Sequence, residues 1–302
     1  MTEHFWTGPK KPGQRGMAKA STDLIEKMYD IIEKIEPVTG RGVGYKLFTA
    51  GLIPSMGVND MKKVYRLLKI ARERGDIPWD WIVDETRELE KLSSWSNLAD
   101  YARTVGRSYR RDFWEQQPCR VEVWSEKGTI RGVLKPVLDQ YGVGFRVMHG
   151  FTSATTAHEI AEDNDGRELH ALYVGDFDPS GLFMSEVDLP NRFESDEYEA
   201  DHVDLQRIAL TKMQTARLPS FPATDKIKDS RYRWFVKNHG KRCWEIDAMD
   251  PNDLRRIVRQ HINRFIEDEE AWKRCETVYK AEQASLKEFA DQMEKLNKRR
   301  AP

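Results

Sequence analysis

Three acidic residues in the middle of the chain have the type and spacing of a divalent-cation site. Glu126 follows the apolar run CRVEVWS, and Asp176 and Asp178 follow a second run, ELHALYV, within GDFDPSG. Carboxylate oxygens are hard ligands that suit Mg²⁺, and bound Mg²⁺ polarises a phosphodiester and stabilises its leaving oxygen. An Asp-x-Asp pair alone is a weak signal, because most such pairs are solvated turns. A strand-end Glu followed by a strand-end Asp-x-Asp is far less common.

Alternating elements must bring these acids together. Helices are predicted over residues 128–142, 155–166 and 180–191, between strands over residues 119–126, 145–150, 168–178 and 203–210. This alternation indicates a parallel, Rossmann-like α/β sheet, in which the carboxyl ends of the strands form the ligand crevice. We therefore expect the three acids at one edge of the sheet. Lys127 either reaches a phosphate there or faces solvent.

Two segments around these acids resemble a known domain. SEKGTIRGVLKPVL and LYVGDFDPSG are similar to a Toprim domain, the metal-binding fold of topoisomerases, primases and some nucleases. The resemblance spans roughly residues 119–250, and CWEIDAMDPNDL resembles a segment that follows the sheet in relatives. It implies that Glu126, Asp176 and Asp178 bind Mg²⁺.

A tyrosine earlier in the chain is the candidate nucleophile. TGRGVGYKLF is predicted to be helical, which places Arg41 one turn before Tyr45 on the same side. A tyrosine hydroxyl, with a pKa of about 10, attacks a phosphate only with help from a base, a cation or a metal. Arg41 could hold that phosphate and stabilise transition-state charge. The alternative is that Tyr45 is a half-buried structural residue.

The tyrosine helix resembles the active-site helix of two related proteins, the DNA-cleaving subunit of topoisomerase VI and the meiotic double-strand-break protein. Arg41 and Tyr45 match the ends of an Arg-x-x-aromatic-Tyr motif, whereas Gly44 stands where Phe or Tyr is usual and removes a packing anchor. The resemblance implies a phosphotyrosyl link to DNA and a homodimer in which the tyrosine of one protomer meets the metal site of the other. ATP hydrolysis would belong to a separate subunit, because this sequence carries no nucleotide-binding motif.

The region before the sheet predicts a winged-helix domain over residues 19–92. It combines three expected helices with a Trp-rich hairpin or loop, over residues 21–36, 41–50, 59–74 and 77–88. In this fold the last helix enters the major groove of DNA. Its basic side chains either merely solvate the helix or contact DNA, and their excess over acids favours contact. They are Lys62, Lys63, Arg66, Lys69, Arg72 and Arg74.

The charge of the 302-residue chain is −1 overall but unevenly distributed. Lys and Arg against Asp and Glu number 20 against 17 in residues 1–118, 7 against 17 in residues 119–202, and 22 against 16 in residues 203–302. An acidic centre between basic flanks suits a cation-binding core whose flanks contact double-stranded DNA. Ordinary surface variation is the alternative.

The remaining segments complete the expected organisation. Residues 1–18 are expected to be a disordered arm, residues 93–118 a helical linker, residues 119–266 the Toprim domain and residues 267–302 a long C-terminal helix. That helix has an apolar stripe suited to packing or dimerisation: Trp272, Val278, Leu286, Phe289, Met293 and Leu296. Three widely spaced cysteines support neither a disulfide framework nor a metal site, and no apolar run could cross a membrane. We expect a cytoplasmic protein.

Three functions fit these features. The first, which the resemblance favours, is Mg²⁺-dependent DNA cleavage of the type IIB topoisomerase kind, with Tyr45 as nucleophile in a homodimer. The second is a Toprim nuclease that uses metal-activated water and keeps Tyr45 for structure. The third is a DNA-binding or assembly module without catalysis, which Gly44 favours.

Overall fold

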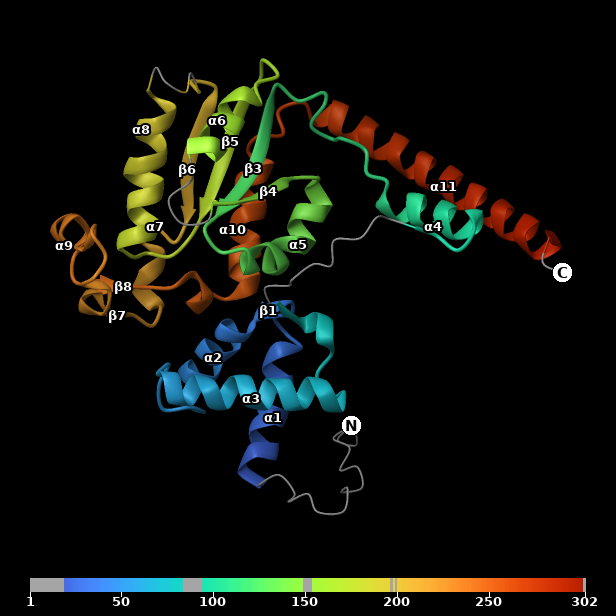
Figure 1. Ribbon diagram of the computed structural model, residues 1–302. Coiled ribbons are helices and arrows are strands. Elements are labelled where there is room, and N and C mark those ends of the chain that lie inside the picture. Colours follow the sequence, from blue (N-terminus) through green and yellow to red (C-terminus); the bar gives the residue numbers. More distant parts are fainter. Residues whose placement is uncertain (1–18, 84–93, 149–153, 196–197, 199, 301–302) are drawn as a thin grey trace.

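The computed structural model describes residues 19–83, 94–148, 154–195, 198 and 200–300 (Figure 1). The expected arm over residues 1–18 lies outside the described residues, as does the part of the expected hairpin beyond Val83. None of the helices in the described ranges combines the length and the apolarity needed to cross a membrane.

A four-stranded parallel sheet forms the centre of the protein, which confirms the predicted α/β class. The strand order is β4-β3-β5-β6, and every neighbouring pair is parallel. The strands are β3 (Cys119–Ser125), β4 (Gly144–Val147), β5 (Glu168–Val174) and β6 (Val203–Ala209). Because parallel strands need crossover connections, helices return the chain between them.

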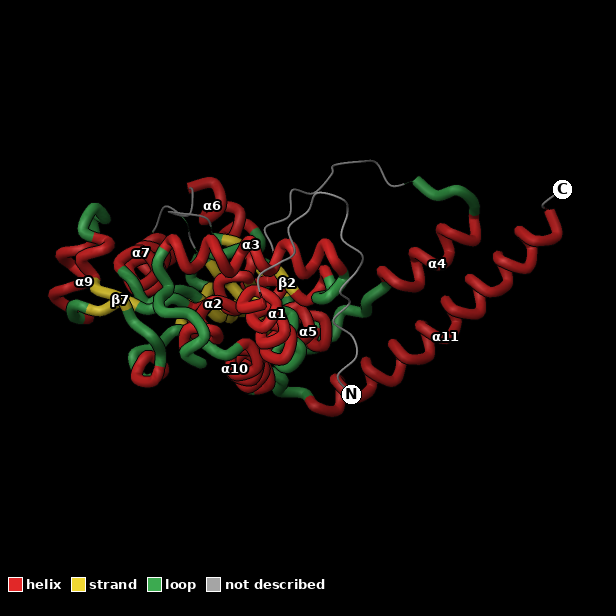
Figure 2. The backbone as a smooth tube through the Cα atoms, turned by 90° about the horizontal axis from the view of Figure 1, so that it is seen from below, coloured by secondary structure: helices red, strands yellow, loops and turns green. Residues whose placement is uncertain are grey.

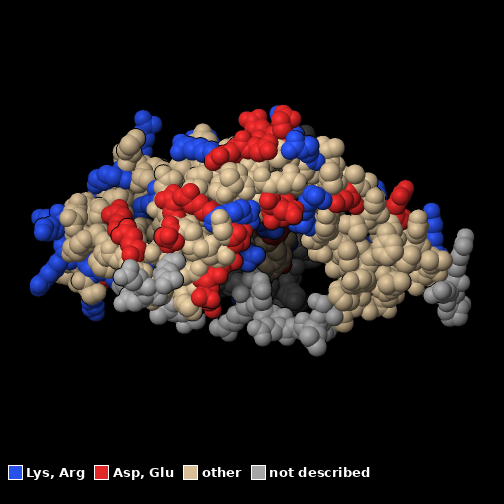
Figure 3. All heavy atoms as spheres, turned by 90° about the horizontal axis from the view of Figure 1, so that it is seen from above, with Lys and Arg blue, Asp and Glu red and all other residues tan. Residues whose placement is uncertain are grey.

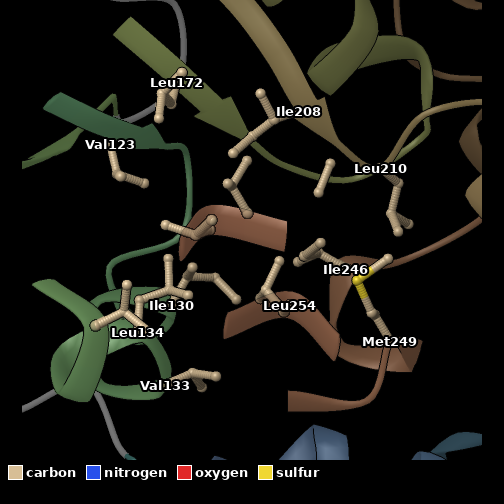
Figure 4. Close-up of a cluster of buried hydrophobic side chains, with 14 of the residues drawn as sticks. Val123, Ile130, Val133, Leu134, Leu172, Ile208, Leu210, Ile246, Met249 and Leu254 are labelled. Carbon is tan, nitrogen blue, oxygen red and sulfur yellow. The ribbon is translucent and has the colours of Figure 1, made fainter. Parts of the chain in front are cut away.

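Helices cover both faces of the sheet. On one face α5 (Thr129–Tyr141) and α10 (Pro251–Asn263) pack on Val123, Leu172 and Ile208, as Figure 4 shows. On the other face lie α6 (Ala154–Glu162), α7 (Pro179–Phe183), a π-helical turn (Met184–Asp188) and α8 (Leu189–Phe193). The last three replace the single helix predicted over residues 180–191.

Three helices before the sheet form a separate apolar cluster, here called the N-terminal unit. They are α1 (Lys19–Ile32), α2 (Gly40–Thr49) and α3 (Val58–Arg74), packed around buried Met28, Ile32, Val43, Leu47 and Leu67. β1 (Val38–Thr39) pairs in parallel with β2 (Ile82–Val83), which follows a 3₁₀ turn (Trp79–Trp81). In its described part, the predicted hairpin is therefore a turn and a strand that pairs with a distant segment.

The N-terminal unit lies beyond the carboxyl ends of the sheet strands, with α2 closest to them (Figure 1). Figure 3 shows the opposite, amino edge of the sheet, where Asp and Glu side chains lie interspersed with Lys and Arg. Glu168, Asp204 and Asp163 there expose more than half of their side chains.

Between sheet and C-terminus the chain forms further short elements that the sequence pattern did not predict. They are 3₁₀ turns over Gln214–Arg217, Ala223–Lys226 and Ile246–Ala248, helix α9 (Tyr232–His239), and the antiparallel strands β7 (Phe221–Pro222) and β8 (Arg242–Cys243). They wrap the carboxyl edge of the sheet.

Helices α4 (Leu98–Ser108) and α11 (Glu269–Arg300) lie side by side as an arm that projects from the body (Figures 1 and 2). The long C-terminal helix is confirmed, and its predicted apolar stripe is only partly covered within one chain. Val278, Phe289 and Leu296 are exposed, while Cys275 and Ala290 are buried. Ion pairs join Arg103 to Glu294 and Arg111 to Glu282, and the Tyr109 ring packs on Tyr279.

Candidate functional site

The three predicted metal ligands lie at the carboxyl ends of two neighbouring strands. Glu126 directly follows β3, and Asp176 and Asp178 follow β5, which pairs with β3. Asp176 and Asp178 expose only 6% and 3% of their surfaces, and Glu126 is partly buried. The structure therefore brings the three acids to one edge of the sheet.

Gly181 lies between the two strand ends that carry these acids, although the carboxylate oxygens of the three do not all come within 4.8 Å of one another. Its N–H donates to Asp178 Oδ1 at 2.8 Å, so that Asp178 caps α7. A Cβ at Gly181 would lie 3.4 Å from Glu126 Oε1 and 2.5 Å from the carbonyl oxygen of Asp176. The second distance is shorter than real Cβ contacts, so only glycine lets the turn fold against both strand ends.

Among the described residues Glu126 makes no hydrogen bond or ion pair, although the charges of Lys127 and Arg207 act on it. Burial, together with the charges of Asp176 and Asp178, raises its pKa to about 7. Like charges held together in a partly desolvated place disfavour ionisation unless positive charge is added. The hard oxygens of the three acids suit Mg²⁺, and an added cation would relieve this repulsion.

Two lysines neutralise the aspartates. Lys127 Nζ lies 2.9 Å from Asp176 Oδ1 and 3.0 Å from Asp247 Oδ2, and Lys226 Nζ lies 3.0 Å from Asp178 Oδ2. Burial raises the pKa of Asp176 to about 6, although Lys127 opposes the rise. Burial also opposes the charge of Lys127, but the surrounding acids outweigh it and hold its pKa above the ordinary value. Lys127 thus points into the acid cluster rather than to solvent.

The segment after β8 closes the same edge. Phe177 and Trp244 form an antiparallel bridge, with N···O distances of 2.9 and 3.0 Å. The N–H of Ile246 then donates to Asp176 Oδ1 at 2.8 Å. These contacts bring Glu245 and Asp247 to the acid cluster.

Partly buried Arg207 holds the turn that carries the aspartates. Its guanidinium donates to the carbonyl oxygens of Gly175, Asp176 and Gly181 at 3.1, 3.2 and 2.6 Å. It also lies over the Tyr173 ring, 5.0 Å from the centroid. Since these bonds cross from β6 to the turn after β5, Arg207 fixes the turn geometry.

Arg41 and Tyr45 lie together on α2, near these acids. Arg41 pairs with Glu245 through two N–H groups, one of them Nη2 at 2.6 Å from Oε1. Its Cζ lies 5.8 Å from the centroid of the Tyr45 ring. Tyr45 is 4% exposed, and its pKa is raised above the ordinary value by burial and by the charge of Glu245, against the influence of Arg41. The charge of Asp176 also raises it, which places Tyr45 within electrostatic range of the acids.

Gly44 leaves no gap in the tyrosine helix. A Cβ at this position would lie 2.5 Å from Met61 Sδ and 3.3 Å from Met56 Cε. Methionine is flexible enough to fill irregular spaces, and here its thioether occupies the place of a side chain at position 44. The departure from the motif is therefore matched by a packing partner on α3.

The basic residues of α3 divide into two groups. Arg72 stacks on Trp79 with Cζ 4.4 Å from the ring centroid, and Arg74 Nε lies 3.1 Å from Asp76 Oδ2. Lys69 lies 3.6 Å from Glu73 across one helical turn. In the described part of the chain, no ion pair involves Lys62, Lys63 or Arg66, and all three are exposed. These three are the members of the predicted DNA-contact set most open to a phosphate.

A different group of side chains, on β5 and β6, holds possible metal-ligating atoms close together. Within the described residues, Glu168, His170 and Asp204 have ligand atoms all within 4.8 Å of one another. His170 Nδ1 lies 3.1 Å from Asp204 Oδ2, and its ring stacks on Phe265 with centroids 4.0 Å apart. These contacts satisfy the ring within the protein, so we assign no metal to this group.

Sequence reasoning assigned no role to Lys226, Glu245 or Asp247. Lys226 lies in a region without a clear pattern, and its pairing with Asp178 follows from the tertiary structure. Glu245 and Asp247 belong to CWEIDAMDPNDL, a segment that the resemblance marks without giving it a role. No protein-family model and no curated protein matches this chain.

Proposed function

We propose that this protein cleaves DNA in a Mg²⁺-dependent reaction of the type IIB topoisomerase kind. In this proposal the parallel sheet is a Toprim domain and the N-terminal unit is a winged-helix domain. The observation that carries the proposal is the placement of Tyr45 and Arg41 beside the strand-end acids Glu126, Asp176 and Asp178. A phosphate held there would meet a nucleophile, a guanidinium and a set of cation ligands.

Glu126, Asp176 and Asp178 would hold Mg²⁺, and the fit rests on their chemistry. They are hard oxygen donors, and Glu126 lacks a cation partner among the described residues. When bound, Mg²⁺ would add positive charge beside a phosphodiester and its leaving oxygen. Lys127 and Lys226, which neutralise the aspartates in this structure, would then be available to neutralise phosphate oxygens.

Tyr45 would form the covalent link. Its hydroxyl oxygen attacks phosphorus, an oxygen–phosphorus bond of the DNA breaks, and the deoxyribose oxygen leaves with a proton. Since burial raises the pKa of Tyr45, the free hydroxyl is a poor nucleophile, and its proton must pass to a nearby base as the bond forms. Arg41 donates two N–H groups to Glu245, and this pair would hold its remaining N–H groups in place for a bound phosphate. The phosphotyrosyl link conserves bond energy, so rejoining is possible.

Cleavage of both strands would require two protomers, so we propose that the protein acts on double-stranded DNA as a homodimer. Lys62, Lys63 and Arg66 would contact its phosphates. Coupling to ATP would need a separate subunit, because the sequence carries no nucleotide-binding motif.

Covalent capture tests the proposal. Supercoiled plasmid is incubated with the protein and Mg²⁺, quenched with detergent, and run with and without protease. We expect cut DNA that enters the gel only after protease, and its loss in Tyr45→Phe. Tyr65→Phe is the matched control, because Tyr65 is an exposed tyrosine on the adjacent α3. Cut DNA in neither lane, with wild-type protein that binds DNA, would contradict the proposal.

One observation favours a second candidate, a nuclease that uses metal-activated water. Tyr45 is almost fully buried and its pKa is raised, as expected for a structural tyrosine. In that case Tyr45→Phe keeps cleavage, and Asp176→Asn abolishes it. Equal cleavage with and without protease would identify this chemistry.

A further inference from the structure

We propose that residues 211–243, here called the basic lobe, form a second surface for double-stranded DNA, separate from α3 and next to the acid cluster. The lobe contains the turns Gln214–Arg217 and Ala223–Lys226, the strands β7 and β8, and helix α9. The choice of DNA rests on the proposed function, since DNA is the polyanion on which the acid cluster would act. The inference adds a surface that holds this DNA beside the cluster.

The basic lobe concentrates the positive charge of the last third of the chain. It contains nine Lys and Arg residues against two Asp and no Glu. In the whole segment 203–302, by comparison, 22 basic residues face 16 acidic ones, so the rest of that segment has 13 against 14. A high local density of positive charge attracts a polyanion and gains from the release of its counterions.

Most of the basic side chains in the lobe are open to a phosphate. Seven of the nine are exposed, and within the described parts of the chain none of the seven forms an ion pair. Lys228, Lys237 and Lys241 are among them. On α11, by contrast, Lys273 and Lys280 each pair with a carboxylate of the same helix. Positive charges that the protein itself leaves without a partner are those available to neutralise phosphates.

The basic lobe is attached directly to the acid cluster. Lys226 Nζ lies 3.0 Å from Asp178 Oδ2, and the Asp178 side chain is only 4% exposed. Lys228, two residues further along the chain, is exposed. Because two residues extend a chain by at most about 7 Å, the Cα atom of Lys228 lies within about that distance of the Cα atom of Lys226. The exposed charge of the lobe therefore begins next to a predicted metal ligand.

A second contact joins the lobe to the turn between the two aspartates. Phe177 stands between Asp176 and Asp178, and its backbone bridges to Trp244, which directly follows β8. Lys212 of the lobe is exposed, and its Nζ lies 5.5 Å from the centroid of the Phe177 ring and 5.3 Å from that of Trp244. A phosphate that meets Lys212 would therefore lie beside the turn that carries the aspartates.

The lobe and the N-terminal unit lie at the same end of the sheet. Figure 1 shows α9, β7 and β8 beyond the carboxyl ends of the strands, as it does α2 and α3. Lys62, Lys63 and Arg66 are exposed on α3. Basic side chains are thus present on both parts of the chain that border the acid cluster, and a duplex that contacts both parts would pass the cluster between them.

Two exposed apolar side chains lie among the charges of the lobe. Met213 is 90% exposed and Ile227 is 59% exposed. Apolar side chains beside Lys and Arg enter the minor groove in some DNA-binding proteins, and the same combination also suits an anionic membrane surface. The attachment of the lobe to the acid cluster favours DNA, because a membrane-binding surface needs no contact with buried carboxylates.

Matched triple variants test the surface in anisotropy titrations with a chelator, where no cleavage is needed. Lys228, Lys237 and Lys241 are replaced by Gln in the lobe. The control replaces Lys280, Lys287 and Lys295 on exposed positions of α11, with the same change in net charge. We expect the lobe variant to bind a duplex about tenfold more weakly, with a salt slope lower by about two to three, and the control to stay within about twofold of wild type. Equal losses in both variants, or no loss in the lobe variant, would overturn the inference.

A photocrosslinker locates the DNA without removing a charge. Position 213 is suited to p-benzoylphenylalanine, because the Met213 side chain is almost fully exposed, and Val278 on α11, 42% exposed, is the control position. After irradiation with a labelled duplex, we expect a protein–DNA band for position 213 and none for position 278. Bands of equal yield at both positions, or no band at position 213, would contradict a DNA surface on the lobe.

These experiments separate the failure of the lobe from the failure of the proposed function. If wild-type protein forms the covalent adduct while the lobe variant keeps its DNA affinity, the lobe is refuted and cleavage stands. If the lobe variant loses DNA affinity but no adduct forms, the lobe stands and cleavage is refuted. Co-sedimentation with vesicles of anionic phospholipid that only the lobe variant loses, at unchanged DNA affinity, would identify a membrane surface and overturn the choice of DNA.

Discussion

Glu126, which makes no ion pair within the described part of the chain, leads to a prediction that requires no DNA. Its ordinary pKa is 4.5, and burial beside Asp176 and Asp178 raises it to about 7 in the folded protein. Folding therefore favours the protonated form, so the stabilisation is complete below the unfolded pKa and is lost as pH rises through the folded pKa. At about pH 8, without a divalent cation, the ionised Glu126 should lower the free energy of unfolding. The shift corresponds to on the order of 1–3 kcal/mol after allowance for its partial exposure.

Glu126→Gln keeps the shape of the side chain and removes the charge. In urea denaturation with a chelator, we expect this variant to be more stable than wild type by about 1–3 kcal/mol at about pH 8, and close to wild type at about pH 5. Asp250→Asn provides the contrast, because Lys46 and backbone N–H groups outweigh burial and lower the pKa of Asp250, so that removing its charge should destabilise the protein at about pH 8.

Mg²⁺ supplies the second half of this test. A ligand that binds only the folded state raises the free energy of unfolding with its concentration. Wild-type protein should therefore gain stability from Mg²⁺ at about pH 8, and Glu126→Gln should gain much less. The reasoning would be refuted if Glu126→Gln destabilised the chelated protein at about pH 8, or if its effect were the same at both pH values.

Two further predictions concern packing and DNA binding. Gly132→Ala should lower the free energy of unfolding by about 1–3 kcal/mol, because the new methyl group meets Val83 at 2.5 Å. The control is Gly106→Ala on α4, where the new methyl group makes an ordinary 3.9 Å contact. In the same urea titration it should be neutral or stabilising by up to about 1 kcal/mol. Equal effects of the two substitutions would contradict the close approach at α5. Replacing Lys62 and Lys63 by Gln should weaken DNA binding in anisotropy titrations. The slope of the logarithm of the association constant against the logarithm of the salt concentration should fall by about one for each phosphate that is no longer neutralised. An unchanged slope would show that these lysines do not contact DNA.

Much of the sheet could be predicted from the sequence, because each strand is a short apolar run bounded by turn residues. The acids at Glu126, Asp176 and Asp178 come directly after two of these runs. Once the strands pair in parallel, their carboxyl ends meet, and local pattern is enough to expect the three acids at one edge. The helices α2 and α3 could likewise be predicted from the helical spacing of their apolar residues, and the glycine after Arg74 indicates where α3 ends.

The partners of those acids were decided only by the tertiary structure. Lys226 reaches Asp178, and Glu245 reaches Arg41, across intervals of sequence that no periodic pattern spans. The exposed stripe on α11 shows the same limit, because helical spacing predicts an apolar face but not which neighbour covers it. Local sequence determines which residues share a strand end or a helix face. The charges that compensate them depend on how distant segments pack, and packing is a property of the whole chain.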